Sequence, residues 1–252
     1  MIKNQRQQQI LDLIKENGSC TVQNLSTIFN VSEPTIRSDL RILDKYGYIT
    51  RQHGGAFLRT NSLKAFSFNL EDRGHNEEKK RIAKKACELI HSGDNIILDS
   101  GSTTTALAQE IMELNNLEIL TNSINIGFQL ASTSNHVVII GGEIKNPTIS
   151  LTGSLGISML NGVYADYLFL ATGGIDVEKG LSLPSFSDVE LKKAMIESAN
   201  KVVLLADSSK IGKVKFATMG CLNKIDILIT DNNVDKNIKK ELEKKGLKVI
   251  TC

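Results

Sequence analysis

The chain has 252 residues and a formal net charge of +2, and its length leaves room for a small module beside a core of about 200 residues. Its four cysteines and four histidines are far apart in the sequence, so no metal-binding motif can be recognised. No other motif indicates a cofactor. With no signal peptide and no apolar run near 18 residues, a secreted or membrane-spanning class is also excluded, so we expect a soluble, reduced, cytoplasmic protein.

Three short amphipathic segments open the chain. Apolar residues recur with helical spacing in residues 5–15, 21–29 and 32–45, and a turn at Asn30-Val31 separates the second segment from the third. The third segment begins with Ser32, a good N-cap, and has a proline in its first turn. This order predicts a helix-turn-helix.

The third segment has two different sides. At 3.6 residues per turn, Ile36, Leu40 and Leu43 fall on the side that packs. The opposite side offers cations and a hydroxyl, from Pro34, Arg37, Ser38, Arg41 and Lys45.

A wing is predicted directly after these helices. Residues 48–53 read as a strand, Gly54-Gly55 as a two-residue hairpin turn and residues 56–58 as a returning strand. Arg51 and His53 lie near the tip, where we expect them to touch the flanking backbone or the minor groove of DNA. The residues expected at DNA are Ser32, Pro34, Thr35, Ile36, Arg37, Ser38 and Arg41 from the helix, and Arg51, His53, Gly54 and Gly55 from the wing.

A single cationic helix is usually only a solvated face, and Arg37 could instead pair with Asp39 or Asp44. Three helices, a cap and a wing in this order favour DNA binding. Residues 1–60 contain eight Lys and Arg against five Asp and Glu, and the remainder contains 22 against 23. An excess of three positive charges binds DNA only weakly, so we expect a dimer or tetramer, which multiplies the contacts with DNA.

These observations divide the chain into a winged helix-turn-helix domain at 1–58, a linker at 59–75 and a second domain at 76–252 that opens with a charged helix over 77–91. In the second domain, apolar runs alternate with helical stretches, which predicts an α/β fold with a mostly parallel sheet. The expected strands are 95–99, 117–121, 137–140, 167–171, 202–206, 225–230 and 247–251, and the expected helices are 103–113, 123–131, 189–199 and 235–245.

Polar residues follow the ends of five of these strands. Ligands bind beyond the carboxyl ends of such sheets, and the first strand leads through hydroxyl residues into a helix N-terminus that favours an anion. Each feature alone is usually a cap, a turn or a solvated lysine, but together they favour a pocket for a phosphorylated small molecule. The candidate residues are Asp99, Ser100, Gly101, Ser102, Thr103, Thr104, Thr121, Asn122, Ser123, Gly141, Gly142, Gly173, Gly174, Asp176, Lys192, Asp207 and Lys210.

Residues 5–58 resemble the winged helix-turn-helix of the DeoR family of bacterial transcription regulators. The matching residues are Arg6, Ile10, Val31-Ser32, Thr35-Ile36-Arg37, Asp39-Leu40, Arg51, His53-Gly54-Gly55 and Ala56. One departure is Ser38, where the family usually carries a second Arg, so the resemblance leaves the affinity for the operator and its sequence open.

The resemblance extends through the second half of the chain. Its motifs are Leu98 to Thr104, Thr121-Asn122-Ser123, Gly141-Gly142, Gly173 to Asp176, Glu190-Leu191-Lys192 and Asp207 to Lys210. The resemblance implies a sensor domain related to ribose-5-phosphate isomerase and the CoA transferases, which binds a sugar phosphate or a related metabolite as effector.

Two functions follow from this. The favoured one is a regulator, most often a repressor, of a sugar or carbohydrate operon, with operator DNA, a phosphorylated sugar and further copies of itself as partners. The alternative is a sugar-phosphate isomerase that uses Asp99, Asp176, Glu178 or Glu190 as base and Lys192 or Lys210 to polarise the oxygen. Against the enzyme, residues 173–176 lack the dense acidic run expected of isomerases.

Overall fold

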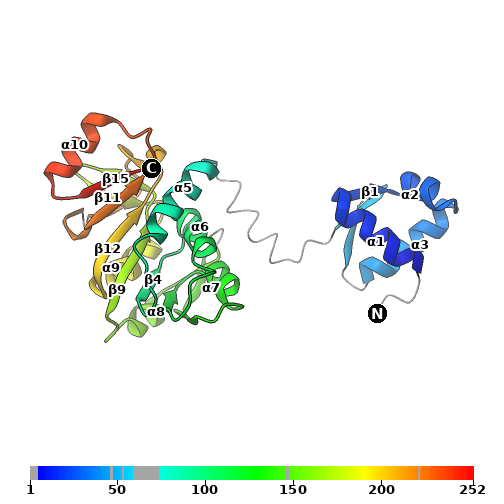
Figure 1. Cartoon of the computed structure of the whole chain (residues 1–252), viewed down its shortest axis with the longest axis horizontal. Coiled ribbons are helices and arrows are strands. Elements are labelled where there is room, and N and C mark those ends of the chain that lie inside the picture. Colours follow the sequence, from blue (N-terminus) through cyan, green and yellow to red (C-terminus); the bar gives the residue numbers. More distant parts are fainter. Residues whose placement is uncertain (1–4, 46–47, 53, 59–73, 146–147, 221) are drawn as a thin grey trace. The chain divides into compact units, whose positions relative to one another are not determined.

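A computed structural model describes residues 5–45, 48–52, 54–58, 74–145, 148–220 and 222–252 (Figure 1). The chain divides into two compact units, Met1–Ala65 and Phe66–Cys252. The division falls within the linker predicted at 59–75, most of which, 59–73, lies outside the described residues.

The first unit packs three helices against a small antiparallel sheet. Ile36, Leu40 and Leu43 are buried in its core with apolar residues of the other two helices, as the helical spacing predicted. The sheet order is β1-β3-β2. The elements are α1 (Gln5–Asn17), β1 (Ser19–Thr21), α2 (Val22–Phe29), α3 (Glu33–Lys45), β2 (Ile49–Gln52) and β3 (Gly55–Leu58).

The turn between α2 and α3 is built by local hydrogen bonds. Thr21 caps α2 by accepting a hydrogen bond from the backbone N–H of Asn24, and Asn30 ends the helix in the left-handed conformation at φ 50°. The carbonyl of Ser32 accepts from the N–H groups of Thr35 and Ile36, which places Ser32 at the start of α3. The predicted helix-turn-helix is therefore present.

The wing differs from the prediction in its turn. Gln52 pairs with Gly55, so Gly55 belongs to β3, and Gly54, with φ +89°, lies between the two strands. His53 lies outside the described residues. A Cβ at Gly55 would lie 2.6 Å from the carbonyl oxygen of Cys20. Gly55 is therefore required by the close approach of β1 and not by the turn.

The second unit is built on a seven-stranded parallel sheet with the order β15-β14-β12-β9-β4-β5-β6. All seven predicted strands are confirmed, with ends that differ by up to three residues. The strands are β4 (Asn95–Leu98), β5 (Glu118–Thr121), β6 (His136–Ile139), β9 (Ala165–Ala171), β12 (Ala199–Leu205), β14 (Ile227–Thr230) and β15 (Lys248–Thr251).

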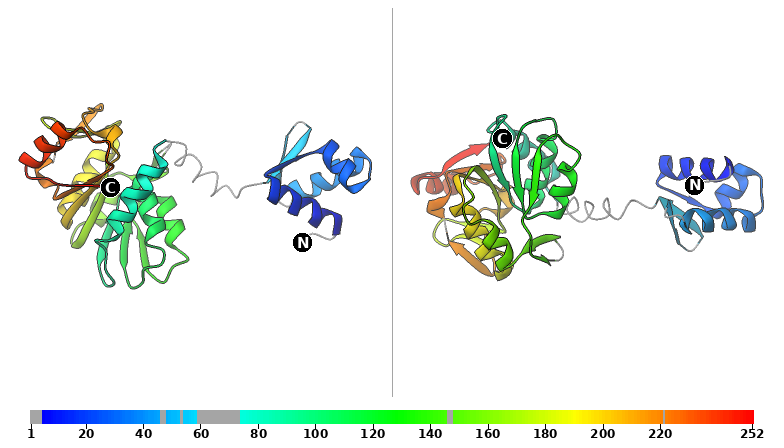
Figure 2. Two further views of the ribbon diagram at one scale, coloured as in Figure 1. Left: turned by 45° about the horizontal axis from the view of Figure 1, so that its top comes forward. Right: turned by 90° about the horizontal axis from the view of Figure 1, so that it is seen from below.

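Helices cover both faces of this sheet (Figures 1 and 2). Because side chains alternate along a strand, Ile96 and Leu98 pack into one apolar cluster, with helices α5, α6 and α7, and Ile97 packs into the other, with α9 and α10. The helices are α5 (Asn76–Cys87), α6 (Ser102–Glu110), α7 (Ile124–Leu130), α9 (Val189–Glu197) and α10 (Lys236–Lys244). The helix predicted over 77–91 ends four residues early, at Cys87.

Several short elements were not predicted. They have only three to six residues, so they carry little periodic signal. They are a hairpin of β7 (Glu143–Lys145) and β8 (Ser150–Thr152), helix α8 (Ser154–Met159), and a small sheet of β10 (Gly174–Asp176), β11 (Gly180–Leu183) and β13 (Ala217–Gly220). Three single-turn helices complete the unit, η1 (Phe186–Asp188), η2 (Ser208–Lys210) and η3 (Leu222–Lys224).

Candidate functional site

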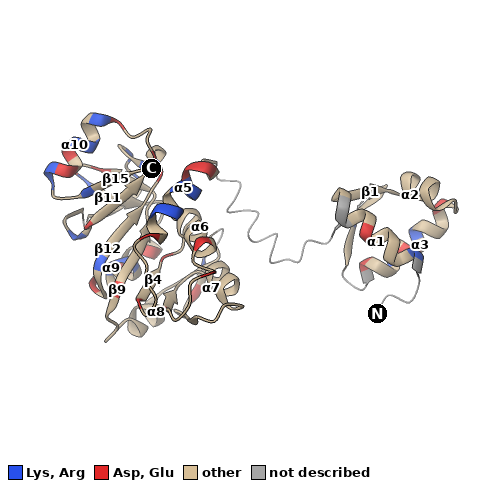
Figure 3. Cartoon of the chain, viewed as in Figure 1, with Lys and Arg blue, Asp and Glu red and all other residues tan. Residues whose placement is uncertain are grey.

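The exposed side of α3 carries the cationic residues (Figure 3). Arg37, Ser38 and Arg41 are exposed together with Ser32 and Pro34, and Thr35 is half-buried with its hydroxyl 2.9 Å from that of Ser32. Among the described residues, Arg41 and the exposed Arg51 of the wing form no ion pair.

One expectation about this helix was wrong, and one alternative is not observed. Ile36 is 0% exposed, so it belongs to the core and offers no surface to DNA in this arrangement. Arg37 pairs with Glu33, one turn back on the same helix, at 3.0 Å, and not with Asp39 or Asp44. Asp39 is committed elsewhere, since its buried carboxylate accepts hydrogen bonds from Arg6 at 2.7 Å and Gln7 at 2.9 Å.

The order of the large sheet reverses between β4 and β9, which are neighbours although they are not consecutive in the chain. At such a switch point the connections leave in opposite directions and open a crevice at the carboxyl ends. Gly101, just after β4, lies so close to β9 that a Cβ there would be 2.5 Å from the Cβ of Ala171. The loop after β4 therefore lies against the end of β9.

Helix α6 begins in this crevice without a side-chain cap. Its N-cap is Gly101, and the first hydrogen bond inside the helix runs from the N–H of Thr105 to the carbonyl of Gly101. The N–H groups of residues 102–104 consequently have no acceptor within the helix. They form a positive end that suits an anion.

The hydroxyls of this loop have two different roles. Thr104 is fully buried, and its hydroxyl donates to the carbonyls of Asp99 at 2.5 Å and Gly101 at 3.0 Å. Thr103 is buried as well. The sequence suggested that both threonine side chains contact a ligand, but neither is accessible to one. Ser100 and Ser102 are half-exposed and remain accessible.

A buried ion pair crosses the switch point. The carboxylate of Asp99 accepts hydrogen bonds from the ammonium of Lys192 on α9 and, at 2.9 Å, from the N–H of Ala171. The same ammonium donates to the carbonyl of Ala171 at 2.8 Å. The pair thus ties β4, β9 and α9 together.

The electrostatics of this pair are unusual. Burial raises the pKa of Asp99, and the charge and hydrogen bond of Lys192 oppose that rise. The Oδ1 atom of Asp99 has no hydrogen-bond partner among the described residues, and the same holds for Oδ1 of Asn122 on the neighbouring strand end. Unpartnered buried acceptors are rare, which marks this region as a place where donors could be bound.

Residues 121–123 divide between structure and site. Thr121 and Ser123 serve local turns, because the hydroxyl of Thr121 accepts from the N–H of Ser123 and that of Ser123 caps α7 through Ile126. Asn122 reaches across to the loop after β4, where its Nδ2 lies 3.3 Å from the hydroxyl of Ser100. Only Asn122 of the three therefore joins the switch-point loop.

The glycine pairs of the candidate set are explained by packing. A Cβ at Gly142 would lie 2.2 Å from the carbonyl oxygen of Thr152 in β8, and one at Gly174 would lie 2.4 Å from that of Lys213. Gly173 lies against Pro184 and the side chain of Lys215, while Gly141 follows β6 at the far edge of the sheet.

The remaining acidic and basic candidates lie on other strand ends or turns. Asp176 accepts from the N–H groups of Glu178 and Lys179 and so holds the β10–β11 turn. Asp207 is buried after β12 and caps η2 through Ser209. Lys210, at the end of η2, is half-buried and forms no ion pair within the described ranges.

One ion pair of this region was not predicted from the sequence. Lys145 on β7 forms an ion pair with Asp188 at the start of α9, and Oδ1 of Asp188 has no partner among the described residues. Asp188 precedes Lys192 by one helical turn, a spacing that suggests a pair between them, but Lys192 binds Asp99 and Asp188 binds Lys145. The contact between Lys145 and Asp188 joins residues 43 positions apart and had no sequence signal.

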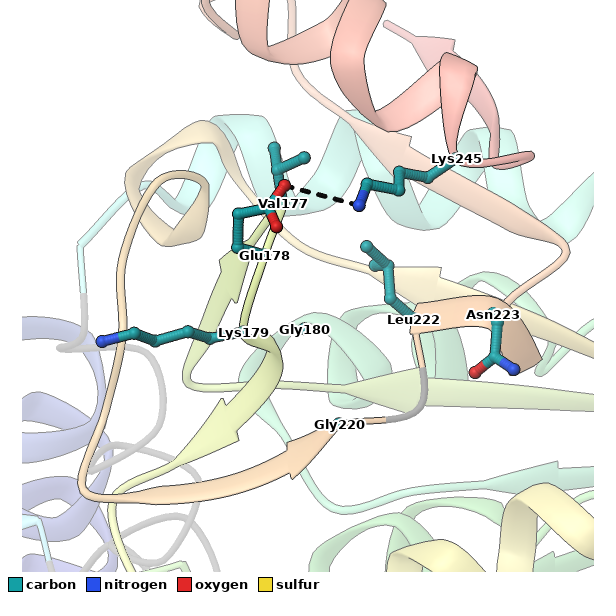
Figure 4. Close-up of a pocket in the computed structure, with 8 residues that line it drawn as sticks. All are labelled: Val177, Glu178, Lys179, Gly180, Gly220, Leu222, Asn223 and Lys245. Atoms are coloured by element: carbon teal, nitrogen blue, oxygen red, sulfur yellow. Dashed lines mark ion pairs between the residues drawn. The ribbon is translucent and has the colours of Figure 1, made fainter.

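A shallow pocket of about 240 Å³ lies elsewhere, around the β10–β11 turn and η3 (Figure 4). Glu178 and Lys245 line it and form an ion pair at 3.4 Å. It includes none of the candidate effector residues, and Glu178 is the one candidate base of the isomerase alternative that lines it. We therefore assign the site to the switch point.

Within the described ranges, no group of three or more His, Cys, Asp or Glu side chains could hold a metal ion. No helix in the described part of the chain is both long and apolar enough to cross a membrane.

Comparison with known proteins matches both units to one family. The family model "DeoR-like helix-turn-helix domain" matches residues 6–62, and "DeoR C terminal sensor domain" matches residues 74–232. The chain is 35% identical to the HTH-type transcriptional regulator GolR of Listeria innocua, over 97% of both chains. It is 32% identical to the Glycerol-3-phosphate regulon repressor of Escherichia coli, over 92% of both chains. Among solved structures it is similar to ribose 5-phosphate isomerase A of Methanocaldococcus jannaschii, with a TM-score of 0.42 and 19% identity over 55% of each chain.

Proposed function

The chain belongs to the DeoR family of HTH-type transcriptional regulators, and we propose that it represses a sugar or carbohydrate operon under the control of a phosphorylated sugar. The observation that carries the proposal is the uncapped start of α6 at the switch point, beside the buried pair of Asp99 and Lys192. The protein would act in the cytoplasm as an oligomer that binds operator DNA.

For DNA, we assign the reading role to α3 and a flanking role to the wing. The exposed residues Arg37, Ser38 and Arg41 share one helical side and would face bases and phosphates in the major groove. Arg51 on β2 would contact the neighbouring backbone or minor groove. Ser32, Pro34 and Thr35 at the start of α3 would meet phosphates, and Gly54 would let the wing approach closely.

For the effector, we assign the phosphate to the free N–H groups at residues 102–104, with Lys192 and Lys210 as cations. The half-exposed hydroxyls of Ser100 and Ser102 would add hydrogen bonds. Asp99 and Asn122 offer acceptor oxygens without partners, which suit the hydroxyls of a sugar. The name of the Escherichia coli relative supports a phosphorylated small molecule.

The isomerase alternative gains no support from the described residues. Glu178 and Glu190 are exposed and form ion pairs with Lys245 and Lys193, and Asp176 holds a turn. The fourth candidate base, Asp99, is the partner of Lys192, the group that was expected to polarise the substrate.

The test is the affinity of the purified chain for a fluorescent duplex covering its own promoter, measured by polarisation at one salt concentration with a panel of sugar phosphates. We expect selective binding to the promoter and a shift with one of these compounds. No preference for the promoter over random duplex would refute the proposal. Turnover of a pentose phosphate above background would instead establish the enzyme.

A further inference from the structure

Strand β6 forms an open edge of the large sheet, because among the described strands it pairs with β5 alone. The backbone N–H groups of His136 and Ile140 donate to carbonyls of the β5 segment, at Leu117 and Thr121. Since backbone groups alternate along a strand, those of Val137 and Ile139 point away from β5. Within the described residues no other segment binds them, so this edge can accept another strand.

The two edges of the sheet differ in how well they are protected. β15, at the other edge, begins with the exposed Lys248, a charge that discourages pairing with a further strand. His136 is the residue of β6 that can carry a charge, and its Nδ1 lies 2.5 Å from Oε2 of Glu118 on β5. The rest of β6 is Val137, Val138 and Ile139, so the remainder of this strand carries no charge.

Large apolar side chains are exposed on both sides of this edge. A Cβ at Gly127 of α7 would lie 2.6 Å from Ile139, and Phe128 is the next residue of that helix. On the other side, the N–H of Gly141 lies 3.1 Å from the sulfur of Met159. We call the set the β6 patch; it comprises Phe128, Ile139, Leu155 and Met159, with exposed fractions of 56%, 40%, 61% and 39%.

We propose that the β6 patch is the surface through which a second copy of this chain binds, with the two β6 strands paired antiparallel. Val137 of one copy would exchange hydrogen bonds with Ile139 of the second copy and the reverse, so a two-fold axis passes at Val138. That axis runs through the sheet and maps each face onto itself. Phe128 therefore meets its equivalent on one face, and Leu155 and Met159 meet theirs on the other.

A second copy fits this surface better than an unrelated protein. Two identical strands satisfy each other's backbone groups only in a self-complementary arrangement, and the apolar residues on each face are then opposed by apolar residues. A helix-turn-helix reads one half-site, and paired half-sites require a two-fold assembly. The inference thus deepens the proposed function and rests on it for this symmetry argument.

The first test is a disulfide cross-link in the full-length chain. At a two-fold axis, paired residues that share no hydrogen bond have Cα atoms about 4.5 Å apart, within the range that a disulfide spans. Val138→Cys should therefore form a covalent dimer under mild oxidation, and a reductant should reverse it. Val249→Cys, on the β15 edge, is the matched control and should form no covalent dimer. The wild-type chain, which has four cysteines of its own, gives the baseline for cross-linking. A chain that is dimeric in solution but does not cross-link at Val138 would overturn the assignment.

The second test changes the charge of the patch. Leu155→Lys places two ammonium groups opposite each other, and we expect dimerisation to weaken about 100-fold, measured by light scattering. Tyr164→Lys is the control, because Tyr164 is 87% exposed and lies outside the patch. A dimer that survives Leu155→Lys, or a wild-type chain that is monomeric, refutes the interface. Neither test uses DNA, so its failure is distinct from a failure to prefer the promoter.

Discussion

The buried pair of Asp99 and Lys192 allows a quantitative test of the site. Lys192→Met keeps most of the side-chain volume but removes the ammonium from a carboxylate that is 0% exposed. Breaking one partner of such a pair costs about 3–5 kcal/mol, because the remaining charge is left uncompensated in the interior. We expect the lower end of this range, since the N–H of Ala171 still donates to Asp99.

The loss should depend on pH in a direction that the structure fixes. In the folded chain, burial raises the pKa of Asp99 above its ordinary value of 3.8. The folded state therefore keeps this proton at a higher pH than the unfolded state does. A group with a raised pKa contributes stability at low pH, and that contribution is lost as the pH rises through the folded pKa. Lys192→Met removes the charge and the hydrogen bond that oppose the rise in the pKa of Asp99. The loss of stability relative to the wild-type chain should therefore be largest near neutral pH and become smaller toward pH 4.

The assay is urea unfolding of the full-length variants, followed by circular dichroism at several pH values. Lys193→Met is the matched control, because Lys193 is the next residue on α9 and forms only an exposed pair with Glu190. The double variant Asp99→Asn with Lys192→Met buries no charge and should recover most of the stability. The reasoning fails if Lys192→Met and Lys193→Met unfold at the same urea concentration at every pH.

Three further variants test separate parts of the molecule. Arg37→Ala should weaken operator binding by about 1–3 kcal/mol and leave urea unfolding unchanged, because its partner Glu33 is on the same exposed helix. Ser102→Asp should abolish the effector response in the polarisation assay while DNA binding remains, since it puts a negative charge at the uncapped start of α6. Burial favours a higher pKa for Asp231, but hydrogen bonds from Ser208 and Asn233 outweigh burial and lower this pKa. Its stability contribution is therefore lost as the pH falls through that pKa, and Asp231→Asn should flatten acid unfolding.

Periodic features of the sequence predicted much of the fold. Leu40 and Leu43 could be placed in the core from helical spacing alone, and the same spacing put Ile36 there, although the family motif suggested a place at DNA. The strands of the large sheet carry continuous apolar runs because both of their faces are buried, so they too were predictable. The polar strand ends could be placed at one edge of the sheet because the strands were predicted to be mostly parallel.

Local competition for hydrogen bonds limited the prediction of the site. Four consecutive hydroxyl residues follow Gly101, but which of them face a ligand depends on which bond their own backbone. Thr104 bonds the loop carbonyls, whereas Ser102 stays accessible. The contact of Lys145 with Asp188 depends on how the β7–β8 hairpin folds over the sheet, which no local pattern encodes.

The ion pairs suggest how the effector site could reach the surface between copies. An anion at residues 102–104 would compete with Asp99 for Lys192 and so act on α9, whose first turn holds Asp188. Asp188 binds Lys145 on β7, the strand that follows β6 in the chain. Since coupling between two sites is typically 1–3 kcal/mol, loss of one linking ion pair could remove it. We expect Lys145→Met to bind both operator and effector but to release DNA no longer when effector is added, and a normal release would break this chain of reasoning.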